Sequence, residues 1–268
     1  MSSSSNDWMM LVVIVAIIGG AGYWLLNREQ AAEPMPVSEP TLPAEATEET
    51  TEPRFPVPRT GMQMPGDLVE LPPLSDSDAY FKLALLDVFG EALAVMLVES
   101  GGIERFVTTV DNLPRSTLSE RLRPVSAVGG SLGIETAGEK LFELSAANSA
   151  RYERYIRLLE QADMDTLVAS YRRFYPLLQQ AYESLGYPDG YFNDRLVEVI
   201  DHLLETPEVS GPVLLRRPHV LYEYADPALE SLSSGQKIMI RIGPDAMSRV
   251  KGKLSELRRR LTSLPQDA

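Results

Sequence analysis

Residues 186–204, with the sequence GYPDGYFNDRLVEVIDHLL, place a tight turn directly before a helix and hold most of the chain's candidate polar chemistry. In the turn Tyr187-Pro-Asp-Gly190, Pro fixes the bend and Gly is able to take a positive φ. The next helix is predicted over residues 192–204, because apolar residues recur there every three or four positions. This apolar face consists of Phe192, Leu196, Val199, Ile200 and Leu203.

The candidate binding site surrounds this turn and consists of Asp189, Tyr191, Asn193, Asp194 and Arg195. Two carboxylates, an amide and a guanidinium in so short a run suit a sugar or a peptide, or a general acid and base acting on a glycosidic bond. Turns and helix caps select the same residue types, so the sequence favours a structural role. Asp189 would then hold the turn, and Asn193 or Asp194 would accept hydrogen bonds from helix amides. Arg195 would pair with an acid, and no catalytic residue is assigned.

An acidic stripe follows another face of the same helix, formed by Asp194, Glu198, Asp201 and Glu205. Its expected partners are the cations of a nearby helix, Arg151, Arg154 and Arg157. His202 follows Glu198 at a spacing that occurs in metal sites, but one His among scattered carboxylates falls short of a site. The chain has no Cys. We therefore expect no metal and no cofactor.

Helical patterns precede the turn. Cap residues at 75–78 start two helices or one kinked helix, with a break near Gly90, and residues 103–113 predict another short helix. Asn148 is expected to cap a helix that runs to Ala162. The next predicted helix has the clearest helical periodicity in the chain. It is capped by Asp163 or Asp165, contains Pro176 and ends at Gly186.

Extended segments and a last helix follow the turn. Residues 213–217 and 220–224 are predicted to form either a hairpin or two crossovers. Residues 140–144 are a possible strand, and residues 234–242 are predicted to form a buried helix or strand. The final helix has the apolar seam Ala246, Val250, Leu254, Leu257 and Leu261. The predicted fold class is mainly α: a transmembrane helix, a disordered linker and one compact helical domain with at most a small two-stranded element.

The N-terminal part predicts a membrane anchor. Residues 9–26 contain no charged side chain and would span about 27 Å as a helix, close to the thickness of a bilayer core. Trp8 at one end, and Tyr23 with Trp24 at the other, suit the two membrane interfaces. A cleaved signal peptide is disfavoured, because residues 1–8 lack the basic side chains that usually precede its apolar segment. The lipid bilayer is thus an expected partner.

Residues 27–74 are rich in Pro, Glu and Thr, which predicts a disordered linker. The predicted organisation is therefore a tail (1–8), a transmembrane helix (9–26), a linker (27–74) and a helical soluble domain (75–264). The only flanking cation is Arg28, so the charge rule mildly favours a cytoplasmic C-terminus. The oligomeric state stays open.

The net charge is -13, although residues 235–268 are basic. Nucleic acid is not expected as a partner of so acidic a chain. The basic C-terminal helix either complements its own helix dipole or binds anionic lipid, and the sequence favours the first.

A G-x-S-x-G pattern, Gly129-Gly-Ser-Leu-Gly133, matches the nucleophile elbow of hydrolases. That elbow requires a strand before the Ser and a helix after it. No helix is predicted after this Ser, and the only candidate bases are His202 and His219. A flexible Gly/Ser loop is the favoured interpretation.

Several runs carry a resemblance to a known family: residues 173–177 (RFYPL), 186–195 (GYPDGYFNDR), 197–209 (VEVIDHLLETPEV), 221–227 (LYEYADP) and 235–238 (GQKI). Across most of residues 71–262 the chain resembles the bacterial domain of unknown function family three thousand and fourteen. The resemblance implies a single-pass protein of the bacterial inner membrane with one soluble domain, and favours a periplasmic location for that domain. It implies no activity and no site residues.

These observations predict a non-enzymatic, membrane-tethered helical domain that binds a partner in the bacterial cell envelope, either a protein or a glycan. The alternative is a glycan-binding or cell-wall-acting enzyme that uses carboxylates of the 189–194 turn. Nine of the eleven Tyr residues lie between Tyr152 and Tyr224, and Tyr serves both as a sugar platform and as a core residue. The sequence leaves that choice open.

Overall fold

The computed structural model describes residues 52–58, 71–118, 124–125, 128, 131–219 and 221–264. The predicted transmembrane helix at 9–26 lies outside these residues, as do residues 27–51 and 59–70 of the predicted linker. Within the described parts of the chain, no helix combines the length and the apolar character needed to cross a membrane. The domain boundaries therefore stay a prediction.

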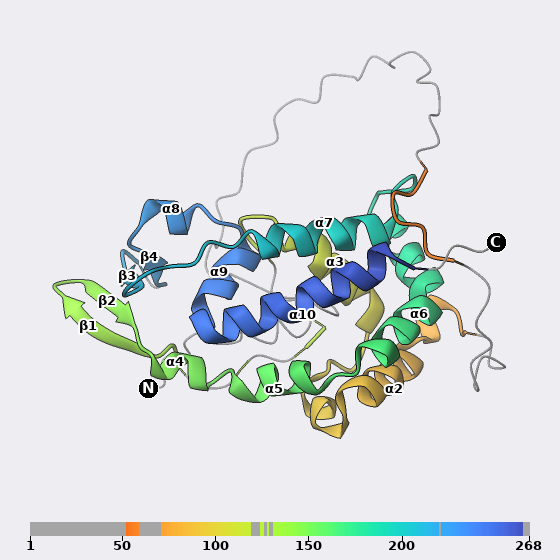
Figure 1. Cartoon of the computed structure of the whole chain (residues 1–268), viewed down its shortest axis with the longest axis horizontal. Coiled ribbons are helices and arrows are strands. Elements are labelled where there is room, and N and C mark those ends of the chain that lie inside the picture. Colours follow the sequence, from red (N-terminus) through yellow and green to blue (C-terminus); the bar gives the residue numbers. More distant parts are fainter. Residues whose placement is uncertain are drawn as a thin grey trace, which may run out of the picture.

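The body of the molecule is a compact group of helices (Figure 1). The longer ones are α2 (Asp78–Phe89), α3 (Gly102–Asn112), α5 (Glu153–Gln161), α6 (Met164–Ser184), α7 (Phe192–Leu204) and α10 (Pro244–Thr262). The shorter ones are the 3-10 helices η1 (Leu74–Asp76) and η2 (Glu91–Met96), and the helices α4 (Ala147–Ala150), α8 (Pro227–Glu230) and α9 (Ser234–Arg241). Helix α10 packs along α7 and α5, α3 packs against α6 and α7, and α2 packs against α3 and α6.

The core is built from the apolar faces that the sequence predicts. The five apolar residues predicted for α7 are each at most 2% exposed, and those of α10 at most 5%. Three edge-to-face ring contacts join the helices: Phe81 with Phe106, Phe81 with Phe174, and Phe106 with Phe192. Each buried ring or aliphatic side chain contributes about 1.5–3 kcal/mol, so burial of these faces holds α7 in place.

A four-stranded antiparallel sheet lies at one end of this body, so the prediction of at most a two-stranded element is wrong. Its strands are β1 (Ile134–Gly138), β2 (Leu141–Leu144), β3 (Leu214–Arg216) and β4 (Glu223–Tyr224), in the order β1-β2-β3-β4. Of the two alternatives for residues 213–217 and 220–224, the structure has the hairpin, in which β3 pairs with β4. Figure 1 shows β1 and β2 extending from the helices. The sheet is larger because Phe142 of β2 pairs with Leu215 of β3, far along the chain.

Two predicted helix caps serve other segments. The carboxylate of Asp78 accepts hydrogen bonds from Gly101 N and Gly102 N at 2.8 and 2.7 Å, so it caps α3 rather than its own helix α2. Asn148 is fully buried inside α4, where its side chain donates to Arg241 O at 3.0 Å. The helix predicted from Asn148 to Ala162 is therefore two helices, α4 and α5. Asp163, in contrast, caps α6 as predicted, by accepting from Thr166 N at 2.8 Å.

Candidate functional site

The turn before α7 is closed by a hydrogen bond from Gly190 N to Tyr187 O at 3.1 Å. Gly190 does not have the positive φ that the sequence suggested, whereas Gly186 does, at 104°. Gly is required at position 190 because an added Cβ would lie 2.9 Å from Cε1 of Tyr182. The rings of Tyr182 and Tyr187 stack with centroids 4.8 Å apart, and burial raises the pKa of Tyr182 to about 12. Packing against this ring pair therefore shapes the turn.

The first amide of α7 is satisfied by Gln179 of α6. Phe192 N donates to Gln179 Oε1 at 2.8 Å, and Gln179 Nε2 donates to Gly190 O at 2.7 Å. Tyr191 occupies the N-cap position without capping the helix by its own side chain. Because Gln179 anchors the start of the helix, the side chains of Asn193 and Asp194 are directed elsewhere.

Asn193 and Asp194 hold the segment 52–58, which lies within the predicted linker. Asp194 accepts hydrogen bonds from two consecutive main-chain amides: Arg54 N at 2.7 Å and Phe55 N at 2.9 Å. Asn193 Nδ2 donates to Phe55 O at 2.7 Å. The structure departs here from the expectation of disorder, because residues 52–58 have a defined place against the domain, shown in orange in Figure 1.

Apolar contacts accompany these hydrogen bonds. Phe55 packs against the main core while remaining partly exposed, and Val57 is buried at 9% exposure. The guanidinium of Arg54 lies over the Phe55 ring at 5.4 Å from its centroid. The segment forms neither helix nor strand. Its contacts thus combine main-chain recognition with the burial of alternate apolar side chains.

Tyr171 of α6 orients the amide of Asn193. Its hydroxyl donates to Asn193 Oδ1 at 2.9 Å, which leaves Nδ2 directed at Phe55 O. Burial, together with Tyr175 and Asp194 nearby, raises the pKa of Tyr171 well above its usual value. The hydroxyl therefore keeps its proton and stays a donor. Asn193 is itself fully buried, so the hydrogen bonds of its side chain fix both ends of the amide.

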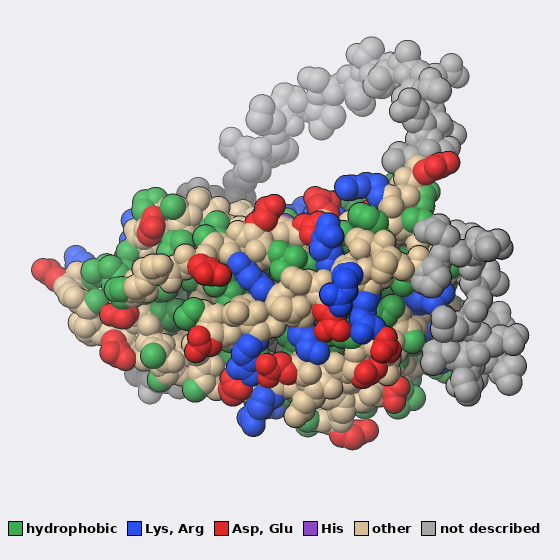
Figure 2. Space-filling view, viewed as in Figure 1, with side chains coloured by type: hydrophobic (Ala, Val, Ile, Leu, Met, Phe, Trp, Pro, Cys, Tyr) green, Lys and Arg blue, Asp and Glu red, His purple; other side chains and the backbone are tan. Residues whose placement is uncertain are grey.

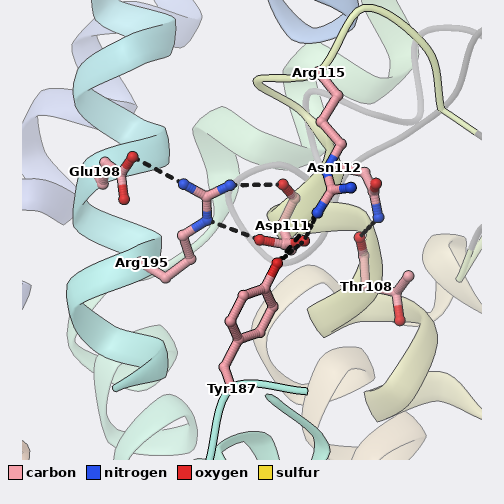
Figure 3. A network of polar contacts seen from close by, with 7 residues as sticks. All are labelled: Thr108, Asp111, Asn112, Arg115, Tyr187, Arg195 and Glu198. Carbon is pink, nitrogen blue, oxygen red and sulfur yellow. Dashed lines mark hydrogen bonds and ion pairs between the residues drawn. The ribbon is translucent and has the colours of Figure 1, made fainter. Parts of the chain in front are cut away.

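Arg195 faces away from this segment and joins a second polar network (Figure 3). It donates to Asp111 Oδ1 at 2.9 Å, to Asp111 O at 2.8 Å and to Glu198 Oε1 at 2.8 Å. Arg115 donates to the other Asp111 oxygen at 2.7 Å, and the Tyr187 hydroxyl lies 3.4 Å from the same atom. The network ties the turn and α7 to the end of α3, as the structural alternative for Arg195 expected.

The five candidate residues are therefore divided among different environments. Asn193 and Asp194 converge on residues 54–55, Arg195 faces α3, Tyr191 is partly buried at the N-cap, and Asp189 is exposed on the turn. Whether these residues bind a ligand stays a prediction. Four residues of these two networks were not predicted from the sequence: Phe55, Asp111, Tyr171 and Gln179. For Phe55 a signal was the run RFPVP, which places an aromatic and an aliphatic side chain at alternate positions between Pro residues.

The predicted pairing of the acidic stripe of α7 with Arg151, Arg154 and Arg157 is wrong. Asp201 pairs with Arg258 of α10, while Glu198 pairs with Arg195. Of the expected partners, Arg151 donates to Asn148 Oδ1 at 2.9 Å and Arg154 lies over the ring of Tyr155. Helix α10 lies beside α7, so its cations are nearer to the stripe.

The basic helix α10 pairs with the domain's own carboxylates. Arg249 bonds Glu153 at 2.9 Å and Glu160 at 2.6 Å, and Arg260 bonds Asp165. These contacts hold the pKa values of Glu153 and Glu160 below their usual range. Figure 2 accordingly shows blue and red side chains interleaved over this face. The cations are engaged within the molecule rather than gathered into a uniform basic patch.

An apolar cavity of about 30 Å³ is lined by residues of α2, α3, α6, α7 and α10. Its lining is apolar apart from Ser170 and the Tyr171 hydroxyl, so it suits neither a sugar nor a metal. Among the described residues, no three His, Cys, Asp or Glu side chains gather in a way that could hold a metal ion. His202 Nε2 instead lies 2.8 Å from Ser233 Oγ, and burial lowers its pKa.

The comparisons with known proteins agree with the family resemblance. No curated protein and no solved structure matches the chain. One family model matches residues 102–258, a span that contains Tyr171, Asn193 and Asp194. Because that match covers more than half of the 268 residues, the chain belongs to the family described as Protein of unknown function (DUF3014).

Proposed function

We propose that this protein is a membrane-tethered, non-enzymatic binding component of the bacterial cell envelope. Residues 9–26 insert into the inner membrane, residues 27–74 form the linker, and the helical domain binds a partner on the periplasmic side. The proposal is supported by one observation above all. The candidate residues Asn193 and Asp194 hold a peptide main chain through three hydrogen bonds, an arrangement that binds without reacting.

The geometry favours binding over acid–base catalysis. A general acid or base must reach the substrate with a free carboxyl oxygen. Both oxygens of Asp194 accept main-chain N–H groups, and Arg195 is occupied by Asp111 and Glu198. Asp189 is exposed on the turn. Of these two carboxylates, Asp194 is therefore engaged by main-chain amides, which supports a binding role rather than an acid–base role for it.

A turnover assay tests the non-enzymatic part of the proposal. The purified full chain is incubated with bacterial cell-wall glycan and its soluble fragments, beside Asp189→Ala and Asp194→Ala variants. We expect no product above background from any of the three. Product formed by the natural chain and abolished by either substitution would establish the glycan-acting alternative instead.

A topology reporter tests the location. An enzyme active only outside the cytoplasm is fused after Ala268, and a second reporter active only in the cytoplasm is fused at the same position. We expect activity from the first fusion alone, and recovery of the protein in the membrane fraction unless residues 9–26 are deleted. Activity from the cytoplasmic reporter alone would refute a role on the periplasmic side.

A further inference from the structure

We infer that Tyr171, Asn193 and Asp194 form a peptide-recognition site for a short aromatic–proline–aliphatic motif, which residues 52–58 occupy as an internal ligand and which a partner protein bearing the same motif fills by displacing them. This inference rests on the binding role proposed above and names the class of partner. The internal ligand has the sequence Glu-Pro-Arg-Phe-Pro-Val-Pro.

The polar half of the site forms hydrogen bonds with main-chain atoms of the peptide. Asp194 receives the amides of Arg54 and Phe55 on its two oxygens, and the Asn193 amide reaches Phe55 O. Two consecutive N–H groups directed at one carboxylate form a compact, charge-assisted pair of hydrogen bonds. These contacts require two successive residues that are not Pro, but they do not otherwise specify side chains. Any polypeptide able to bend in this way offers the same atoms.

The apolar half supplies the sequence preference. Phe55 packs against the main core of the domain, and Val57 is the more deeply buried of the two side chains. Pro56 restricts the backbone conformation of the preceding Phe55. Each Pro also lowers the conformational entropy of the free peptide, so less entropy is lost when the peptide binds. The favoured ligand is therefore an aromatic residue, a Pro and an aliphatic residue in succession, preceded by a residue with a free amide.

The site is preformed by contacts that do not involve its occupant. The Tyr171 hydroxyl fixes Asn193, Gln179 satisfies the first amide of α7, and Arg195 ties α7 to Asp111 on its other side. All of these groups lie inside residues 102–258, the part of the chain that matches the family, whereas residues 52–58 lie before it. A rigid site with a ligand drawn from a separate segment is the arrangement expected when that ligand is exchangeable.

An internal ligand also regulates access. A segment joined to the same chain competes at an effective concentration on the order of millimolar. A free peptide of equal intrinsic affinity therefore binds the natural chain weakly, and a partner succeeds by local concentration or additional contacts. Removing residues 52–58 from the site should allow a free peptide to bind with its full intrinsic affinity.

The test uses the full chain in detergent micelles and a fluorescently labelled peptide, EPRFPVP, followed by fluorescence anisotropy. In the first variant, Phe55→Ala and Val57→Ala together remove the internal apolar contacts. In the second, Arg54→Pro removes the N–H that Asp194 Oδ2 accepts. We expect both vacated variants to bind the peptide at least about tenfold more tightly than the natural chain, because internal competition is lost.

The controls separate recognition from a general change in the protein. Adding Asp194→Ala to a vacated variant should weaken binding at least about tenfold, since two hydrogen bonds to a charged group are lost. Adding Asp245→Ala, at an exposed position in the first turn of α10, should leave binding unchanged. A peptide with Ala in place of its Phe should fail to bind. Circular dichroism and thermal unfolding verify that each variant is folded.

Two results would overturn the inference. Folded vacated variants that do not bind the peptide at millimolar concentration would show that residues 52–58 are not an exchangeable ligand. Unfolding of both vacated variants would show that the segment is a fixed part of the core. Either result would remove the contact that supports a binding role, whereas the topology reporter and the glycan assay test the location and the non-enzymatic character independently. Conversely, a cytoplasmic domain would leave the peptide result standing.

Discussion

Arg195 donates one hydrogen bond to the side chain of Asp111, at 2.9 Å, and another to its main-chain carbonyl, at 2.8 Å. Asp111 has a side chain only 4% exposed, and that of Arg195 is 17% exposed. The pair joins α7 to the end of α3. Because both groups are largely removed from water and their other charge partners, Arg115 and Glu198, are exposed, each is the other's most buried charge partner.

Replacing Asp111 should therefore be costly. In Asp111→Ala the guanidinium of Arg195 keeps only the exposed Glu198 as a charge partner, and we expect the free energy of unfolding to fall by about 3 kcal/mol. Arg115→Ala is the matched control, since the Arg115 side chain is 53% exposed and its loss should cost less than about 1 kcal/mol. Urea denaturation of both variants provides the measurement. Equal losses would contradict a special role for the Arg195 pair.

Asp194→Ala should release residues 54–55 without unfolding the domain. The amides of Arg54 and Phe55 lose their acceptor, so their hydrogen exchange should accelerate at least about tenfold, while amides in the middle of α7 keep their protection. Exchange measured by mass spectrometry or NMR resolves the two regions. Asp189→Ala should leave both unchanged. Unaltered protection at Arg54 and Phe55 in Asp194→Ala would mean that the carboxylate does not hold the segment.

Two glycine substitutions should have opposite effects. In Gly190→Ala the new Cβ meets Cε1 of Tyr182 at 2.9 Å, and we expect a loss of about 1–3 kcal/mol from overpacking. Gly252, inside α10, has nothing within 4 Å of an added Cβ. Gly252→Ala should stabilise the protein by about 0.5–1 kcal/mol, because Ala is the better helix former. Thermal unfolding of the two variants checks the sign, and a stabilising Gly190→Ala would refute the close approach.

His202 should make stability depend on pH. Burial lowers its pKa from 6.5, despite the opposing effect of Glu205 and Glu198. As pH falls below 6.5 the unfolded chain binds the proton first, so the free energy of unfolding decreases until the pH reaches the lower pKa of the folded state. His202→Gln removes this contribution. The difference in unfolding free energy between the natural chain and the variant should change between pH 7 and pH 5, and a constant difference would contradict the shift.

Local sequence patterns correctly located most helices. Residues 192–204 form α7 with the predicted buried face, Asp163 caps α6, and the apolar seam of α10 is buried. These features follow from the 3.6-residue period and from hydrogen bonds between near neighbours, so a short window of sequence contains the information. Family membership was likewise recognisable from short runs, and the family match confirms it.

Features formed by distant residues escaped the sequence analysis. The same carboxylate types that pair with Arg in one environment bind main-chain amides in another, so Asp194 and Asp201 could not be assigned partners from their spacing. Asn148 illustrates the same difficulty. Asn is typical of helix caps, but this one is buried inside α4 and donates to the carbonyl of Arg241. Such assignments require knowledge of which segments the fold brings together.

The sequence by itself determined the helices, their buried faces and the membership of the family, because those properties depend on the periodicity and order of side chains. Only the tertiary structure decided that β2 pairs with β3 and that Asp194 holds residues 54 and 55, which lie 140 and 139 positions earlier. The physical reason is the same in both cases. In each case at least one of the groups that meet is a main-chain N–H or C=O group, which nearly every residue carries, so no side-chain pattern identifies the partners.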